Sequence, residues 1–350
     1  DGASPTPGQT VMQVKGTVAA THVQPDGSGR LCAPRRQIVL GLGASLIAAT
    51  AWAKFPERPV KLIVPFAPGG GTDAIARELA SGMALALGVP VVVDNKPGAG
   101  TLIGSDFVAK SPADGHVLVM ATFAHAVNPS LYAKLPFDFK KAFAPISLVA
   151  HGPNVLVVRS DSAWRQWGDL LEFARAHPEE LSYASQGNGT SAHLAGEMLC
   201  RLARVNLKHV PYRGAGLAMM DVLGGQVDMM FATAAAVAPH IRQGKLRALA
   251  ITSNERWAAQ PDLPCIAERV PGYLVESWYG LLAPAGTPPD VVTSLHAAVA
   301  RSATEEKFKL KMASEGLTIS AGSPQELAAY IQREEARWMR IVKDHPISID

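Results

Sequence analysis

Two glycine-rich stretches have the composition expected of main-chain anion sites. In FAPGGGTDAIAR, Gly69, Gly70 and Gly71 lie between an apolar run and a helical pattern. Glycines let the backbone approach a ligand closely, and the free N–H groups at the start of a helix attract negative charge. The stretch SQGNGTSAH, residues 185–193, has the same character. We therefore expect each stretch to contact a negatively charged ligand.

Neither stretch completes a nucleotide-binding motif. The first lacks the Lys and the following hydroxyl of G-x-x-x-x-G-K-[ST], so Mg²⁺ and phosphates would have no side chains to hold them. A plain strand-to-helix turn is the alternative there. In the second, 187–192 fits G-x-G-x-x-A, but the acid that should follow about 20 residues later is absent from the end of the next strand, KHVPY.

The second stretch also approaches a hydrolase motif. Residues 183–187, YASQG, differ from G-x-S-x-G because Tyr183 replaces the first glycine in a crowded turn. His193 is two residues from Ser191, a spacing that points the two side chains apart on a helix. An exported serine hydrolase that uses Ser185 or Ser191 is the alternative from the enzyme class. No residue pattern indicates a metal site.

The elements that carry these loops follow a strand–loop–helix order. Apolar runs at 60–66, 89–95 and 115–122 alternate with helical patterns, which favours a buried parallel sheet. The first helix has an apolar stripe, with Thr72 expected as its N-cap and Gly88 at its end. A turn is expected at 121–128. A second set of strands and helices covers 167–252.

Two extended stretches, 147–160 and 276–288, separate the two sets of elements. We predict two α/β lobes joined at a hinge, with the two glycine-rich loops facing one cleft. The predicted boundaries are 54–154 and 276–350 for the first lobe, and 155–275 for the second. Residues 1–53 are predicted to be an N-terminal extension and a signal peptide.

The signal-peptide prediction depends on Arg35, Arg36, an apolar run at 38–50 and a small-residue site at 51–53. The run is shorter than the ~20 residues of a membrane span, although an anchor is the alternative. We expect export to the periplasm and cleavage near Ala53, by either the Sec or the twin-arginine route. Cleavage would lower the net charge from +3 to +1, which argues against nucleic-acid binding.

The cysteines that remain after cleavage, Cys200 and Cys265, form either a disulfide or two buried thiols.

From Phe55 to the C-terminus the chain resembles the Bug family, the TctC-like extracytoplasmic solute receptors of tripartite tricarboxylate transporters. The resemblance is carried by FPERPVKLIVPFAPGGGTDAIAR, VVVDNKPGAGTLIGSDFVAKSPADGHVLVMAT, NPSLYAKLPFDF, SYASQGNGTSAHLAGE, HVPYRGAG, DVLGGQVDMMFAT, GKLRALAITS and WYGLLAPAGTP, in that order. His116 and Cys265 depart from the usual residues but lie outside the expected cleft.

The resemblance implies a type II periplasmic-binding-protein fold, in which two crossover segments join the lobes around the ligand. It also implies a small carboxylate ligand: a dicarboxylate, a tricarboxylate, an acidic amino acid or an aromatic acid. The predicted ligand-binding residues are Phe66, Ala67, Gly69, Gly70, Gly71, Thr72, Asp73, His125, Asn128, Ser185, Gly187, Gly189, Thr190, Ser191, His193 and Thr233.

We therefore predict a solute-binding receptor and not an enzyme. It would act as a monomer without a cofactor or metal, and would deliver its ligand to the membrane subunits of a transporter. A co-receptor for a membrane sensor kinase is the alternative within the same fold.

Overall fold

The computed structural model describes residues 55–257, 260–344 and 347. The predicted extension and signal peptide, residues 1–53, lie outside the described residues. All elements below belong to one compact unit, Trp52–Asp350.

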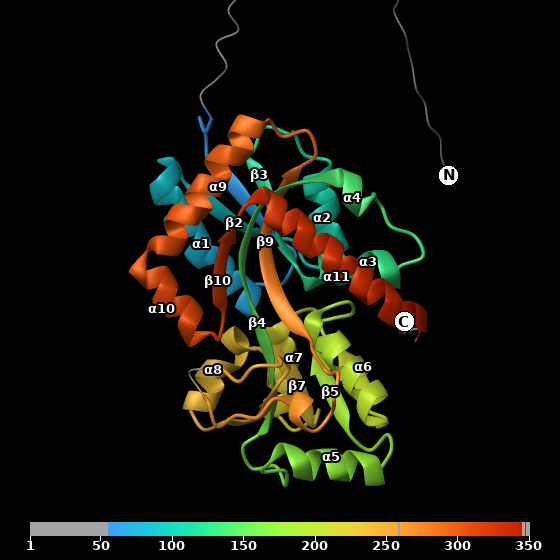
Figure 1. Cartoon of the computed structure of the whole chain (residues 1–350). Coiled ribbons are helices and arrows are strands. Elements are labelled where there is room, and N and C mark those ends of the chain that lie inside the picture. Colours follow the sequence, from blue (N-terminus) through green and yellow to red (C-terminus); the bar gives the residue numbers. More distant parts are fainter. Residues whose placement is uncertain (1–54, 258–259, 345–346, 348–350) are drawn as a thin grey trace, which may run out of the picture. The chain divides into compact units, whose positions relative to one another are not determined.

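The first lobe is built on a mixed sheet (Figure 1). Its strands, in spatial order, are β2 (Val91–Asn95), β1 (Val60–Val64), β3 (Val117–Thr122), β9 (Glu276–Pro284) and β4 (Phe143–Arg159), with β10 (Thr318–Gly322) on the far side of β4. Strand β1 is parallel to β2 and β3, as predicted, whereas β9 and β10 are antiparallel to their neighbours. The parallel arrangement predicted for the strands at 60–66, 89–95 and 115–122 is confirmed, and β9 and β10 add antiparallel neighbours because β9 runs back into the lobe.

The second lobe continues from the other half of β4. The strand order is β4, β7 (Met229–Thr233), β5 (Ser182–Ser185) and β6 (Lys208–Pro211), and β8 (Leu246–Ile251) also pairs with β4. Strand β5 is parallel to β6 and β7, while β7 and β8 are antiparallel to β4. One long strand thus belongs to both lobes.

The helices flank these sheets. The first lobe carries α1 (Gly71–Leu87), α2 (Leu102–Ala109), α3 (Phe123–Leu131), α4 (Phe139–Ala142), α9 (Pro289–Thr304), α10 (Glu306–Ser314) and α11 (Pro324–Asp344); the second carries α5 (Trp167–Ala176), α6 (Ser191–Ala203), α7 (Ala215–Leu223) and α8 (Ala234–Arg242). Short 3₁₀ turns occur at η1 (Ala99–Thr101) and η2 (Ile266–Glu268). Within the described part of the chain, no helix has the length and apolar character needed to cross a membrane.

The first-lobe core shows why α1 takes its position. Val60, Leu62 and Val64 alternate along β1 and face one side of the sheet, as the two-residue period of a strand requires. The apolar stripe of α1, which includes Ile75 and Leu79, packs in the same cluster. This packing places the N-terminus of α1 directly after the strand end, at the level of the glycine-rich loop.

The stretch predicted as a turn at 121–128 is in fact the end of β3 followed by helix α3. Pro129 lies inside α3, where a proline removes one main-chain hydrogen bond and therefore argues against a helix. The helix tolerates it because it ends two residues later, at Leu131. α11 packs along α3 and supports it.

Candidate functional site

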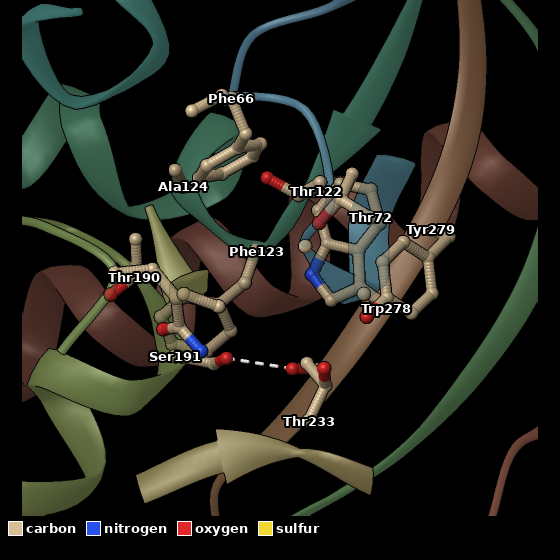
Figure 2. A pocket seen from close by; sticks show the side chains of 16 residues that line it. Phe66, Thr72, Thr122, Phe123, Ala124, Thr190, Ser191, Thr233, Trp278 and Tyr279 are labelled. Atoms are coloured by element: carbon tan, nitrogen blue, oxygen red, sulfur yellow. Dashed lines mark hydrogen bonds between the residues drawn. The ribbon is translucent and has the colours of Figure 1, made fainter. Parts of the chain in front are cut away.

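A cavity of about 510 Å³, including its opening to solvent, lies where the two lobes meet (Figure 2). Its walls are formed by Phe66, Ala67, Gly70, Gly71, Thr72, Thr122, Phe123, Ala124, Gln186, Thr190, Ser191, Ala215, Thr233, Ser277, Trp278 and Tyr279. None of these lining residues carries a charged side chain.

Five helices begin at this wall. α1 starts at Gly71, α3 at Phe123, α6 at Ser191, α7 at Ala215, and α8 directly after Thr233. The first turn of a helix has N–H groups without helical partners, and its dipole places partial positive charge there. The cavity is therefore polarised toward an anion by main-chain groups from both lobes.

The first glycine-rich loop is held by a buried carboxylate. Asp73 is only 4% exposed; one of its oxygens accepts the Gly69 N–H at 3.0 Å and the Arg77 Nε–H at 2.9 Å, and the other accepts the Asn95 amide at 3.0 Å. Burial alone would raise the pKa of Asp73, but the hydrogen bonds from Arg77, Gly69 and Asn95 outweigh it and hold the pKa below its usual range. Asp73 thus fixes the shape of the loop and is not part of the cavity wall.

The N-cap of α1 is Gly70 and not Thr72, which corrects the sequence-based expectation. The backbone of Gly70 is extended and the helix starts one residue later, so Thr72 lies within the first turn. A threonine hydroxyl that does not cap its own helix is available to the cavity. Figure 2 shows Thr72 on the cavity wall, close to Tyr279.

The second loop is held by its own polar groups. Thr190 is the N-cap of α6; its hydroxyl accepts the His193 N–H at 3.3 Å and donates to the Gly187 carbonyl at 2.7 Å. The Ser191 hydroxyl lies 2.6 Å from that of Ser277, which comes from the crossover strand β9 (dashed line in Figure 2). The α6 N-terminus is therefore fastened to the hinge.

Two stacked histidines stand behind this loop. The rings of His193 and His209 are 4.2 Å apart and nearly parallel. His193 Nδ1 accepts the Gly189 N–H at 3.2 Å, and His209 Nε2 is 2.7 Å from the Ser185 hydroxyl. Burial, with a smaller effect of His209, lowers the pKa of His193 to about 3, and burial lowers the pKa of His209 to about 4. Both rings are therefore neutral near pH 7 and position the loop from outside the cavity.

His125 and Asn128 are buried in α3 and do not line the cavity. His125 Nδ1 accepts the Thr122 N–H at 3.1 Å, its Nε2 lies 3.0 Å from the Ser105 hydroxyl, and burial lowers its pKa to about 4. The Asn128 amide donates to the Gly100 carbonyl at 2.8 Å. Both side chains hold main-chain segments in place.

The sixteen predicted site residues thus fall into two sets. Those in the cavity wall are Phe66, Ala67, Gly70, Gly71, Thr72, Thr190, Ser191 and Thr233. Those outside it are Gly69, Asp73, His125, Asn128, Ser185, Gly187, Gly189 and His193. Most of the second set shapes the loops that carry the first.

Part of the wall was predicted only as ranges: 121–128 contains Thr122, Phe123 and Ala124, and 185–193 contains Gln186. Sequence reasoning missed Ala215, Ser277, Trp278 and Tyr279. The buried Tyr279 hydroxyl lies near the hydroxyls of Thr72, Thr233 and Ser277, and the buried Trp278 indole N–H has no hydrogen-bond partner among the described residues. Buried polar groups are nearly always paired, so the Trp278 N–H is a donor that a bound molecule can use.

A hydrolase site does not form in this geometry. Ser185 and His209 make the pair that a serine nucleophile needs, but Ser185 is fully buried, lies outside the cavity wall, and accepts the Gly187 N–H at 3.1 Å. Ser191 lines the cavity, but its hydroxyl is hydrogen-bonded to Ser277 and Asn154 and not to a histidine. Cys200 and Cys265 are free thiols.

The fold and the cavity define a two-lobe solute-binding receptor of the periplasmic-binding-protein class. Residues 75–347 match the family described as "Tripartite tricarboxylate transporter family receptor". The chain belongs to this family, and the resemblance to Bug proteins seen in the sequence is confirmed.

Two relatives show the extent of the match. The chain is 38% identical to the UPF0065 protein in the tcbD-tcbE intergenic region of Pseudomonas sp. strain P51, over 90% of this chain and 95% of the relative. It is 34% identical to BugT of Bordetella pertussis, over 86% of this chain and 93% of that protein.

Two solved structures share the architecture. The Rpa4515 protein of R. palustris with adipate is 35% identical and superposes with a TM-score of 0.80, over 83% of this chain and 97% of that one. MatC of Rhodopseudomonas palustris with bound malate is 33% identical with a TM-score of 0.78, over 82% and 100%. The predicted two-lobe α/β fold is thus confirmed, and the chain is a solute-binding receptor and not an enzyme.

Proposed function

We propose that this receptor binds a small organic carboxylate in the cavity between its lobes and delivers it to the membrane subunits of a tripartite transporter. The observation that carries the proposal is the convergence of five helix N-termini on a cavity whose lining has no charged side chain. A carboxylate fits such a site because neutral N–H and hydroxyl donors stabilise its charge without a competing cation.

Polar groups at the cavity support an oxygen-rich ligand. The Trp278 N–H is buried and unpaired among the described residues, and it and the hydroxyl cluster of Tyr279, Thr72 and Thr233 could donate to a carboxylate or to a water that bridges to one. Adipate and malate, which occupy the two similar structures, are both small carboxylates. The ligand of this chain belongs, in our proposal, to the same broad chemical class.

Ligand capture would use closure of the two lobes about β4 and β9. The structure has close approaches of glycine backbone to side chains of the other lobe: a Cβ on Gly214 would lie 3.3 Å from Ala67 Cβ, and one on Gly189 would lie 2.6 Å from Asn128 Oδ1. Glycine leaves room for a neighbouring group to come this close. The lobes of a closed, ligand-retaining state would interlock at these points.

The site of action in this proposal is the periplasm. Residues 35–53 carry the basic, apolar and small-residue pattern of a signal peptide, and cleavage near Ala53 would release the receptor as a monomer that needs no cofactor.

A thermal-shift screen tests ligand capture. The mature chain should be stabilised by at least one acid from a panel of dicarboxylates, tricarboxylates, acidic amino acids and aromatic acids, by about 2.7 kcal/mol at 100 times its Kd. Thr233→Val, in the cavity wall, should weaken the shift, whereas Thr293→Val on the exposed face of α9 should leave it unchanged. Stabilisation by neutral sugars and by no acid would overturn the proposal.

Delivery needs a separate measurement. Proteoliposomes that hold the transporter membrane subunits should take up the labelled acid only when the loaded receptor is present.

A further inference from the structure

A second hollow opens directly outside the cavity. It shares Phe66, Gln186 and Thr190 with the cavity wall, so the two spaces lie next to each other at these side chains. The outer hollow measures about 830 Å³ with its opening to solvent. A ligand whose first carboxylate lies at the helix N-termini could therefore extend into it.

Both lobes contribute to the walls of the outer hollow. Residues 97–101 and Tyr132 come from the first lobe, and 186–188 and 211–213 from the second. The segment Ala99–Thr101 has positive φ at three successive residues and is held by Asn128, whose amide donates to Gly100 O and Thr101 Oγ1. A group bound in this hollow would contact both lobes, as closure requires.

The cavity and the outer hollow have one cationic side chain among the described residues that line them. Arg213 is the single charged residue among the described residues that line the cavity or the outer hollow. Its side chain is exposed and makes no hydrogen bond or ion pair with any described residue. Arg213 therefore has no structural ion pair within the described part of the chain. Its guanidinium is available to a ligand.

The backbone at Arg213 is held in place by its neighbour, although the Arg213 side chain makes no hydrogen bond with a described residue. The neighbouring Tyr212 donates its N–H to Ser185 O at 3.1 Å, and its hydroxyl donates to Asp221 at 2.6 Å. On the opposite wall, Tyr132 presents a hydroxyl that makes no hydrogen bond with a described residue. A Cβ on Gly100 would lie 2.5 Å from this hydroxyl, so only glycine leaves it room.

We propose that the outer hollow is a subsite for the second carboxylate of a dicarboxylic acid, bound by the guanidinium of Arg213 and the hydroxyl of Tyr132. The proposal rests on the proposed function, because it takes the first carboxylate to be held in the cavity. The division is physically reasonable: neutral donors serve the enclosed end, where a cation would lose its hydration, and the cation serves the exposed end.

Matched acids and matched variants test this subsite. Isothermal titration compares adipate with hexanoate, and succinate with butanoate, since each pair differs by one carboxylate at constant chain length. Arg213→Gln should weaken dicarboxylate binding about three- to tenfold and change monocarboxylate binding less than twofold. Tyr132→Phe should act in the same direction, and Arg175→Gln on the exposed face of α5, which removes the same charge, should have no effect.

Salt gives a second readout. An exposed charge pair is screened, so added NaCl should weaken the wild-type protein's binding of the dicarboxylate more than that of the monocarboxylate, and Arg213→Gln should abolish this difference. The subsite is overturned if Arg213→Gln leaves dicarboxylate affinity unchanged, or if it weakens both acids of a pair equally. If the wild-type chain binds neither acid of any pair but is stabilised by another acid of the thermal-shift panel, the subsite is overturned and the proposed function stands; if no acid of that panel binds, both are overturned.

Discussion

The contact between Gly189 and Asn128 should control closure of the lobes. Gly189 has φ +76°, and a Cβ added there would lie 2.6 Å from Asn128 Oδ1 across the lobe boundary. Asn128 cannot move aside easily, because it is fully buried and its amide donates to Gly100 O at 2.8 Å. The substitution Gly189→Ala therefore adds a methyl group where the closed lobes leave no space.

The size of the effect has two parts. Left-handed backbone at alanine costs about 1–2 kcal/mol, which lowers the stability of the fold whether or not the lobes are closed. Relief of the overlap costs a further 1–3 kcal/mol, roughly the range for an extra methyl group in a packed site, and this part arises only on closure. The Kd should consequently rise about 5- to 150-fold.

A matched glycine separates the two parts. Gly244 has φ +67°, and a Cβ added there would have no other atom within 4 Å, so Gly244→Ala has the backbone strain without the contact. Unfolding in urea should show similar losses of stability in both variants. Titration with the identified acid should show weaker binding only in Gly189→Ala. Equal affinities for the two variants would refute the idea that the lobes interlock at Gly189.

Three further predictions follow from buried groups. The folded-state pKa values of His193 and His209, about 3 and about 4, lie below the unfolded value near 6.5, so their contribution to stability is complete above pH 6.5 and decreases as the pH falls through the folded values. Each histidine should lower the free energy of unfolding by about 2 kcal/mol between pH 7 and pH 5, and urea titrations of His209→Gln should show a shallower pH dependence; an identical slope would contradict this. Asp73→Asn removes the charged acceptor that holds Gly69, Arg77 and Asn95. The variant should therefore lose about 1.5–3 kcal/mol of folding stability and bind the ligand more weakly. If neither the stability nor the affinity changes, Asp73 does not hold the loop. Trp338 of α11 is fully buried and packs edge-on against Phe123 of the cavity wall, with 5.1 Å between the ring centroids. Trp338→Ala should therefore reduce the free energy of unfolding by about 3–5 kcal/mol. Met339→Ala, at a side chain that is 47% exposed, should change it by less than about 0.5 kcal/mol.

Much of this fold could be predicted because its strongest signals are local. The apolar run of β1 and the stripe on α1 each follow one period, and buried packing confirms both. Strand β10 was missed because a short edge strand that pairs only with β4 has no comparable signal. Helix α3 was missed because Pro129 is typical of a turn.

The site could be predicted only in part, for a geometric reason. Loop glycines such as Gly70 indicate main-chain contact wherever they lie, and two such loops identified the two sides of the cavity. The direction of a side chain depends on packing instead. His125 points from α3 toward Ser105, whereas Trp278 and Tyr279, on a strand with the apolar pattern of a core strand, contribute to the cavity wall. Nothing in their sequence distinguishes these orientations.

The central claim is that main-chain donors in the cavity select a carboxylate. Isothermal titration of one acid against its primary amide, adipate against adipamide for example, measures this selection directly because the two have nearly the same shape. The convergence of five helix N-termini on a cavity wall without charged side chains predicts clear binding of the acid and none of the amide. Equal binding of both compounds would contradict the account.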